Sequence, residues 1–318
     1  MPISVMLKPA SGNCNLRCEY CFYHDLAATR QTENKGYMTR DTALQVMDKA
    51  LAFAGDGPVY FTFQGGEPLL AGKAFYRRVL ALQKQYNTRR LPVTNALQTN
   101  GTLLDEEWAE LFAEGQFLVG ISLDGPASLH DRYRVDTAGA ATHARALQGA
   151  ELLKKHGVPY NILCVVTQQI AAAPDTVFDA LAPHGYLQFI PCLDALDGQP
   201  DEFSLQPEAY GQFLVRTFDR YEDAWRSGRP VSIRAFDNWV GMLLGQPPES
   251  CGMSGRCGHY YVIEADGSVY PCDFYVLDEW RLGNINDTSF FKLTNSPLGA
   301  EFRRLSIPLP ESCRACPY

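Results

Sequence analysis

Eight of the ten cysteines stand in short groups, and these groups are the part of the sequence most suited to metal or redox chemistry. They are Cys14, Cys18 and Cys21, then Cys251, Cys257 and Cys272, and last Cys313 with Cys316. Grouped cysteines in a cytosolic chain more often bind metal or take part in redox reactions than form structural disulfides. The two isolated cysteines, Cys164 and Cys192, are predicted to be small buried hydrophobic residues.

The first group has the spacing C-x3-C-x2-C. A structural zinc site uses four ligands, commonly as two close pairs, whereas this group offers three thiols and no nearby fourth cysteine. His24 could complete a zinc site. The spacing is better suited to an iron–sulfur cube in which the protein holds three irons. The fourth iron is then open to a small molecule that binds through amino and carboxylate groups.

The segment CNLRCEYC resembles the signature loop of the radical S-adenosylmethionine (SAM) enzymes. Other segments resemble the anaerobic sulfatase-maturating enzymes, which belong to the SPASM-domain group: CNLRCEYCFYH, FQGGEP, LQTNGTL, SLDGP, NILCVVT, and CGMSGRC followed by DGSVYPCDFYVLDEWRLGNI. This resemblance covers nearly the whole chain. It implies radical oxidation of a cysteine or serine in a sulfatase peptide to Cα-formylglycine, which activates the sulfatase.

The resemblance also implies roles for single residues. Cys14, Cys18 and Cys21 would hold the [4Fe-4S] cluster that cleaves SAM. The implied SAM-binding residues are Tyr20 and Leu193 at the adenine, Gly65, Gly66 and Glu67 at the amino group, and Ser122 and Arg134 at the ribose and carboxylate. A guanidinium can bind a carboxylate through two parallel hydrogen bonds, which suits Arg134. As alternatives, Arg134 could be a solvated charge and Leu193 an ordinary core residue.

The second cysteine group resembles the ligand set of a first auxiliary [4Fe-4S] cluster, and the last cysteine pair resembles the start of a second. Relatives in this family continue with further cysteines after that pair, whereas this sequence ends at Tyr318. Three thiols therefore remain for the first auxiliary site and two for the second. Either the chain is truncated or these clusters are incomplete, so their occupancy is left open. His259 is a candidate substitute ligand, although a histidine at a hairpin edge is more often exposed.

Asp273 directly follows Cys272, and the resemblance implies that it is the base that removes a proton from the substrate. Burial of a carboxylate raises its pKa and makes it a better base. The alternative is that Asp273 hydrogen-bonds the turn after a hairpin. Tyr23 is a second candidate in the same pocket.

Six short apolar segments alternate with helical patterns and predict parallel strands in a partial (β/α)6 TIM-like barrel. They are residues 5–7, 59–63, 93–97, 117–121, 160–166 and 187–190. The clearest helix covers residues 43–54, with Thr39 or Asp41 as its cap. Polar or glycine-rich loops follow five of the six strands. Because the chemistry of such a barrel gathers where strands end, these loops predict one shared site.

The alternation changes after about residue 206. Two β-rich runs flank Asp266-Gly267, a strong hairpin signal, and this hairpin is predicted to bring Cys257 and Cys272 together. We therefore expect a radical SAM barrel over residues 1–235 and a cysteine-rich SPASM-type domain over residues 236–318.

Composition limits the partners. The 36 acidic and 28 basic residues give a net charge of −8, which argues against a broad nucleic-acid surface. No segment is apolar enough for a membrane span, and the first ten residues lack a secretory layout, so a cytoplasmic protein is expected. The resemblance implies a sulfatase polypeptide as substrate and an electron donor such as flavodoxin or ferredoxin.

Two alternative functions remain from the sequence. One is another SPASM-type peptide-modifying enzyme, for example one that forms thioether crosslinks. The other is a non-catalytic metal-binding scaffold that binds a partner, and the complete set of SAM-pocket residues argues against it.

Overall fold

A sheet of ten strands forms the centre of the computed structural model, which describes residues 2–196, 198–258 and 260–316. The strand order is β10-β9-β8-β1-β2-β3-β4-β5-β6-β7. The strands are β1 (Ile3–Leu7), β2 (Val59–Phe63), β3 (Val93–Thr99), β4 (Phe117–Ser122), β5 (Tyr160–Val166), β6 (Tyr186–Pro191), β7 (Ser232–Ile233), β8 (Tyr261–Ile263), β9 (Ser268–Tyr270) and β10 (Gly283–Asn284). All pairs from β1 to β7 are parallel, which confirms the predicted barrel architecture.

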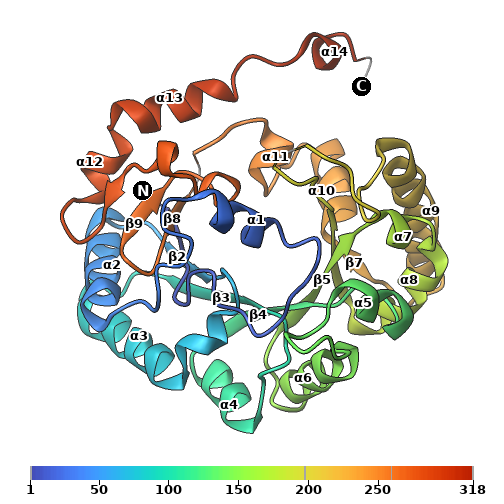
Figure 1. Ribbon diagram of the computed structural model, residues 1–318, viewed down its shortest axis with the longest axis horizontal. Coiled ribbons are helices and arrows are strands. Elements are labelled where there is room, and N and C mark those ends of the chain that lie inside the picture. Colours follow the sequence, from blue (N-terminus) through green and yellow to red (C-terminus); the bar gives the residue numbers. More distant parts are fainter. Residues whose placement is uncertain (1, 197, 259, 317–318) are drawn as a thin grey trace.

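Helices lie around the outside of the curved sheet (Figure 1). The longer ones are α1 (Phe22–Thr29), α2 (Arg40–Phe53), α3 (Lys73–Tyr86), α4 (Glu106–Glu114), α5 (Ala127–Tyr133), α6 (His143–Lys155), α8 (Pro174–Leu181), α9 (Pro207–Arg226), α10 (Arg234–Leu243) and α13 (Pro297–Leu305). Shorter helical turns are η1 (Pro68–Ala71), α7 (Gln168–Ala171), η2 (Ala182–His184), α11 (Cys251–Ser254), η3 (Asp273–Tyr275), η4 (Asp278–Trp280), α12 (Phe290–Thr294) and α14 (Glu311–Arg314).

The helix α2 shows why these segments fold as they do. Its apolar residues recur every three or four positions, so one face is buried while the other is polar. Of the two predicted caps, Thr39 is the one observed, because its side chain accepts a hydrogen bond from the Thr42 backbone N–H. The buried face packs against the strands, whose inward side chains continue the same core.

The sheet does not close into a full barrel, because β1 pairs with β8 on its second edge instead of with β6 or β7. Val5 lies opposite Tyr261 and Leu7 opposite Ile263 in this parallel pair. The β8–β9 hairpin was predicted, but its attachment to the first strand was not. One sheet therefore runs across the predicted boundary near residue 235, and the division into two domains stays a prediction.

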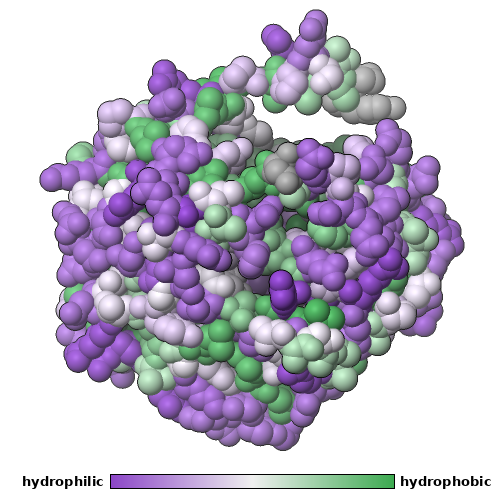
Figure 2. Space-filling view, in the orientation of Figure 1, coloured by the Kyte–Doolittle hydropathy of each residue, from purple (hydrophilic) through white to green (hydrophobic). Residues whose placement is uncertain are grey.

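The surface gives two further observations. Among the helices in the described ranges, none combines the length and apolar character that crossing a bilayer requires. Figure 2 shows a mainly hydrophilic face with apolar groups gathered near its centre.

Candidate functional site

The loops that follow β1, β2 and β3 are hydrogen-bonded to one another, as a shared site requires. The backbone N–H of Gly66 donates to the carbonyl of Ser11 at 2.8 Å, and that of Glu67 donates to the carbonyl of Asn13 at 2.7 Å. The backbone N–H of Asn100 in turn donates to the Glu67 carboxylate at 2.8 Å. These three strand ends therefore lie together as expected, and their use as one functional site stays a prediction.

The first cysteine group lies in the loop between β1 and α1, and all three thiols are half-buried. Burial raises the pKa of the Cys14 thiol to about 12 and that of Cys18 to about 11. The Leu16 backbone N–H donates to the Cys14 sulfur at 3.4 Å, and the Arg134 guanidinium lies 3.9 Å from the Cys18 sulfur. Thiols held this way need a strong positive partner to ionise, and cluster iron is such a partner.

A single zinc ion and an iron–sulfur cube are the two alternatives for these thiols. Within residues 2–196, 198–258 and 260–316, no three His, Cys, Asp or Glu side chains lie close enough to share one metal ion. A four-iron cube places each thiolate on a different iron, so its ligands stand further apart than those of one ion. His24 is exposed. The described part of the chain therefore does not bring His24 and the three thiols together as a zinc site, and the iron–sulfur cube stays a prediction for this loop.

Glu67 is fully buried and accepts three hydrogen bonds. The donors are the backbone N–H groups of Leu69 and Asn100, at 2.9 and 2.8 Å, and the Thr99 hydroxyl at 2.9 Å. Burial outweighs these bonds and raises the pKa of Glu67 to about 7. The carboxylate thus ties the second and third strand ends together beneath the cysteine loop.

The two glycines before Glu67 are required by packing within the chain. A Cβ on Gly66 would lie 2.0 Å from the carbonyl oxygen of Asn13, and Gly65 has a φ of +142°. Glycine therefore lets this loop touch the backbone of the cysteine loop. The sequence suggested that these glycines admit the SAM amino group, and that role stays a prediction.

Arg134 is buried and paired, so the solvated alternative is wrong. Its Nε donates to Asp124 Oδ2 at 2.7 Å, and its guanidinium carbon lies 5.3 Å from the Tyr20 ring centre. The Tyr20 hydroxyl donates to the same carboxylate oxygen, while the Val165 backbone N–H donates to the other at 2.9 Å. Asp124 lies in the SLDGP segment, and nothing in its sequence neighbourhood singles it out.

Ser122 and Leu193 occupy the remaining predicted SAM-binding positions. The Ser122 hydroxyl accepts a hydrogen bond from the Gln98 amide at 3.0 Å. Leu193 is 46% exposed, so it is not an ordinary core residue. It lines a crevice of about 90 Å³ together with Tyr20 and the cysteine loop.

Asp273 reaches the same region from the C-terminal part of the chain. It is 4% exposed, and its carboxylate forms an ion pair with the Lys8 ammonium at 2.6 Å. The Gln64 amide donates to its other oxygen at 3.1 Å. Because the side chain binds residues at the ends of β1 and β2, it does not serve the hairpin turn. Gln64 belongs to the FQGGEP segment after the second strand but had no predicted role, and nothing in the sequence near Lys8 pointed to it.

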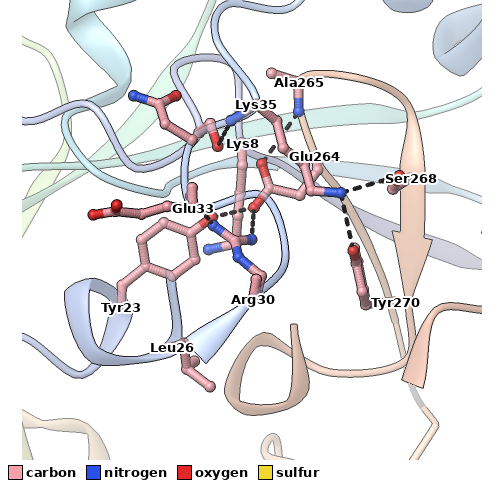
Figure 3. Close-up of polar contacts among 12 residues, drawn as sticks. Lys8, Tyr23, Leu26, Arg30, Glu33, Lys35, Glu264, Ala265, Ser268 and Tyr270 are labelled. Carbon is pink, nitrogen blue, oxygen red and sulfur yellow. Dashed lines mark hydrogen bonds and ion pairs between the residues drawn. The ribbon is translucent and has the colours of Figure 1, made fainter. Parts of the chain in front are cut away.

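Tyr23 lies beside this ion pair. The Lys8 ammonium is 3.8 Å from the centre of its ring. Its hydroxyl donates to the Glu264 carboxylate, to which Arg30 also binds (Figure 3). Burial holds the pKa of Tyr23 well above its usual range, so the phenol is neutral.

The other cysteines divide into three kinds. Cys251, Cys257 and Cys272 are half-buried, and burial raises the pKa of Cys272. Cys313 and Cys316 are exposed, on and after α14, which stands apart in Figure 1. Both isolated cysteines, Cys164 and Cys192, are buried as predicted. The candidate ligand His259 lies outside the described residues.

Comparisons with known proteins give consistent results. The family model of the radical SAM superfamily matches residues 9–177, more than half of the chain, and that of an iron–sulfur cluster-binding domain, SPASM, matches residues 251–317. A cysteine-type anaerobic sulfatase-maturating enzyme from Clostridium perfringens strain 13 is 44% identical over 321 residues, which cover 100% of this chain and 86% of that protein. A serine-type enzyme from Bacteroides thetaiotaomicron is 34% identical over 339 residues, covering 100% and 80%.

Solved structures of related proteins match the fold of this chain. One described as native anSMEcpe with bound AdoMet and Cp18Cys peptide matches with a TM-score of 0.94 and 42% identity, covering 100% of this chain and 86% of that one. Streptococcus suis SuiB bound to S-adenosylmethionine matches with a TM-score of 0.68 and 15% identity, covering 100% and 71%, and shows a shared fold.

Proposed function

The chain belongs to the radical SAM superfamily and, within it, to the anaerobic sulfatase-maturating enzymes, and on that premise we propose that it oxidises a cysteine of a sulfatase polypeptide to Cα-formylglycine. Its cofactors are SAM and [4Fe-4S] clusters. Cysteine is preferred over serine as the substrate residue because identity is 44% to a cysteine-type relative and 34% to a serine-type one.

When bound, the cofactors supply the radical that removes a hydrogen atom from the substrate β-carbon and an acceptor for the second electron. Oxidation of a –CH2–SH group to –CH=S removes one hydrogen atom, one proton and one electron. Water then replaces the sulfur, hydrogen sulfide leaves, and the aldehyde of formylglycine remains. The chain must therefore provide a proton acceptor at the substrate thiol.

The position of Asp273 carries this proposal. Its carboxylate comes from the C-terminal part of the chain, yet it is buried against Lys8 and Gln64 at the ends of β1 and β2. Those strands lead directly into the cysteine loop and the Gly65–Glu67 loop. We assign the proton transfer to Asp273, with Lys8 and Gln64 holding its two oxygens.

The remaining site residues take the roles that the family implies. Cys14, Cys18 and Cys21 would hold the SAM-cleaving cluster, and Cys251, Cys257 and Cys272 an auxiliary one. The SAM-binding assignments cover Tyr20, Gly65, Gly66, Glu67, Ser122, Arg134 and Leu193. The buried Asp124 fixes both Tyr20 and Arg134, which supports a preformed pocket.

We also propose a cytoplasmic location and an electron donor such as flavodoxin or ferredoxin. All ten cysteines are free, and thiols stay reduced in the cytoplasm. Cleavage of SAM needs one electron from outside, which a small one-electron carrier provides.

The test is the mass of a synthetic peptide that contains the maturation-site cysteine of a sulfatase. The peptide is incubated anaerobically with the iron–sulfur-loaded chain, SAM and a reductant. Exchange of the sulfur and two hydrogens for one oxygen supports the proposal. Cleavage of SAM without peptide oxidation would leave only the superfamily, and loss of two hydrogens with the sulfur retained would indicate thioether formation.

A further inference from the structure

Glu264 and Arg30 form an ion pair deep between α1 and the β8–β9 hairpin. Arg30 Nη1 lies 2.6 Å from Glu264 Oε1, and both side chains are fully shielded from solvent. The Ala265 backbone N–H lies 3.3 Å from the other carboxylate oxygen. Figure 3 shows the guanidinium, the carboxylate and the Tyr23 ring facing one another in this space.

An ion pair in this position is costly. Removing two charges from water carries a desolvation penalty, and an apolar pair of similar volume often stabilises a fold as well or better. Stability alone therefore does not explain why the chain places Glu264 and Arg30 here, and their neighbours offer a more specific reason.

The first neighbour is Tyr23. Its hydroxyl donates to Glu264 Oε1, the same oxygen that binds Arg30. Two donors from α1 and its end therefore converge on one oxygen of the hairpin. These contacts anchor the hydroxyl end of the Tyr23 ring.

Lys8 connects the Tyr23 ring to Asp273, the proposed base. The Lys8 ammonium lies 3.8 Å from the centre of the Tyr23 ring, within the range of a cation–π contact. The same ammonium is 2.6 Å from the Asp273 carboxylate. The ring thus closes one side of Lys8 and directs its charge toward Asp273.

We propose that Glu264 and Arg30 are positioning residues for the oxidation step: they hold the Tyr23 ring against Lys8 and so fix the Lys8–Asp273 pair in the geometry that receives the substrate proton. This inference rests on the proposed function, because it gives Asp273 the role of base. Neither Glu264 nor Arg30 touches the carboxylate of Asp273 in this account; both act through Tyr23 and Lys8.

The competing explanation is that the pair only fastens the hairpin to the segment after α1. Lys35 provides a matched control for that role. Its ammonium bonds Asp266 at 3.1 Å and the Tyr270 hydroxyl at 3.2 Å, so it joins the same segment to the same hairpin. In the described part of the chain the bonds of this ammonium go to Asp266, Ser268 and Tyr270 of the hairpin, and Tyr23 is not among its partners in Figure 3. Lys35→Met therefore loosens the attachment and leaves the Tyr23 ring anchored.

The experiment compares the unsubstituted chain with Glu264→Gln, the double variant Arg30→Met/Glu264→Leu, and Lys35→Met. The double variant leaves no lone buried charge, so it protects the test against a failure of Glu264→Gln to fold. Each protein is loaded with iron and sulfide, and its melting temperature and iron content are recorded. The decisive quantity is the amount of formylglycine formed in the synthetic peptide for each 5′-deoxyadenosine released.

A positioning role predicts that this ratio falls about tenfold in both Glu264 variants, since a small misplacement of a reacting group strongly reduces rate. Lys35→Met should keep the ratio of the unsubstituted chain even where its melting temperature falls. A ratio unchanged in the double variant, or lowered equally by Lys35→Met, would overturn the positioning role. An unsubstituted chain that cleaves SAM without oxidising the peptide would instead overturn the proposed function, and with it this inference.

Discussion

Lys8 shows how a single residue can join distant parts of the chain. Its side chain is fully buried, and a buried ammonium is tolerated only beside an opposite charge. Asp273 supplies that charge from the C-terminal part of the chain. Nothing adjacent to Lys8 in the sequence indicates this partner, and an N-terminal lysine is usually exposed. The sequence could therefore indicate Asp273 by family resemblance but could not predict what holds it.

The burial of Glu67 at the ends of β2 and β3 should make the free energy of unfolding depend on pH. The folded-state pKa of about 7 lies above the unfolded value of 4.5, so folding favours the protonated acid. The stability from this group is fully present below pH 4.5 and is lost as the pH rises through 7. Relative to Glu67→Gln, the unsubstituted chain should lose roughly 3 kcal/mol of unfolding free energy between pH 4.5 and pH 8.

Urea unfolding of both proteins at intervals across that range measures the difference. A difference that stays constant with pH, or that grows in favour of the unsubstituted chain as the pH rises, would show that Glu67 is not held in the environment described.

The positions of the barrel strands could be predicted from the sequence, whereas the pairing of the C-terminal hairpin with β1 could not. The apolar runs at residues 59–63 and 160–166 match β2 and β5 because each is flanked by glycine, proline or polar residues. The parallel order also followed from the alternation with helices. The pairing of β8 with β1 could not be predicted, because a three-residue strand carries no signal for its partner. Asp124 was missed for a related reason, since its three partners come from separate elements.

The close contact between the Gly65–Glu67 loop and the cysteine loop can be tested by substitution. Gly66→Ala places a methyl group against the Asn13 carbonyl, so the Gly65–Glu67 loop must move away from the cysteine loop. We expect a loss of about 1–3 kcal/mol in unfolding free energy, together with reduced iron retention.

Gly211→Ala in α9 is the matched control. A Cβ there meets open space, and alanine favours a helix by about 1 kcal/mol over glycine, so the control should be neutral or stabilising. Denaturant unfolding and iron content measure both variants. If Gly66→Ala were as stable as Gly211→Ala, the close packing of these loops would not be required.

Across the whole molecule, one sheet serves both the barrel and the cysteine-rich region. The hairpin completes the edge of β1 and carries the chain on to Asp273, so the proposed base arrives beside the cysteine loop as a direct result of strand pairing. The resemblance found in the sequence covers nearly the whole chain, and the comparisons confirm the family over the full length. What the sequence could not supply is the geometry that joins the two ends of the chain at one site.

This architecture predicts unequal roles for the cysteine groups. Replacing Cys14, Cys18 and Cys21 with alanine should lower the iron content by about four atoms per chain and abolish SAM cleavage. Replacing the exposed Cys313 and Cys316 with serine should leave SAM cleavage intact, because these thiols lie away from the cysteine loop. Iron and sulfide analysis with 5′-deoxyadenosine measurement tests both expectations, and equal losses in the two variants would contradict them.

The central claim is that Asp273 accepts the substrate proton, and the most direct measurement is peptide oxidation by Asp273→Asn. Asparagine keeps the shape of the side chain but is a poor base. We expect this variant still to release 5′-deoxyadenosine from SAM while formylglycine formation falls by about 100-fold or more. Formylglycine produced at the rate of the unsubstituted chain, with SAM cleavage intact, would contradict it.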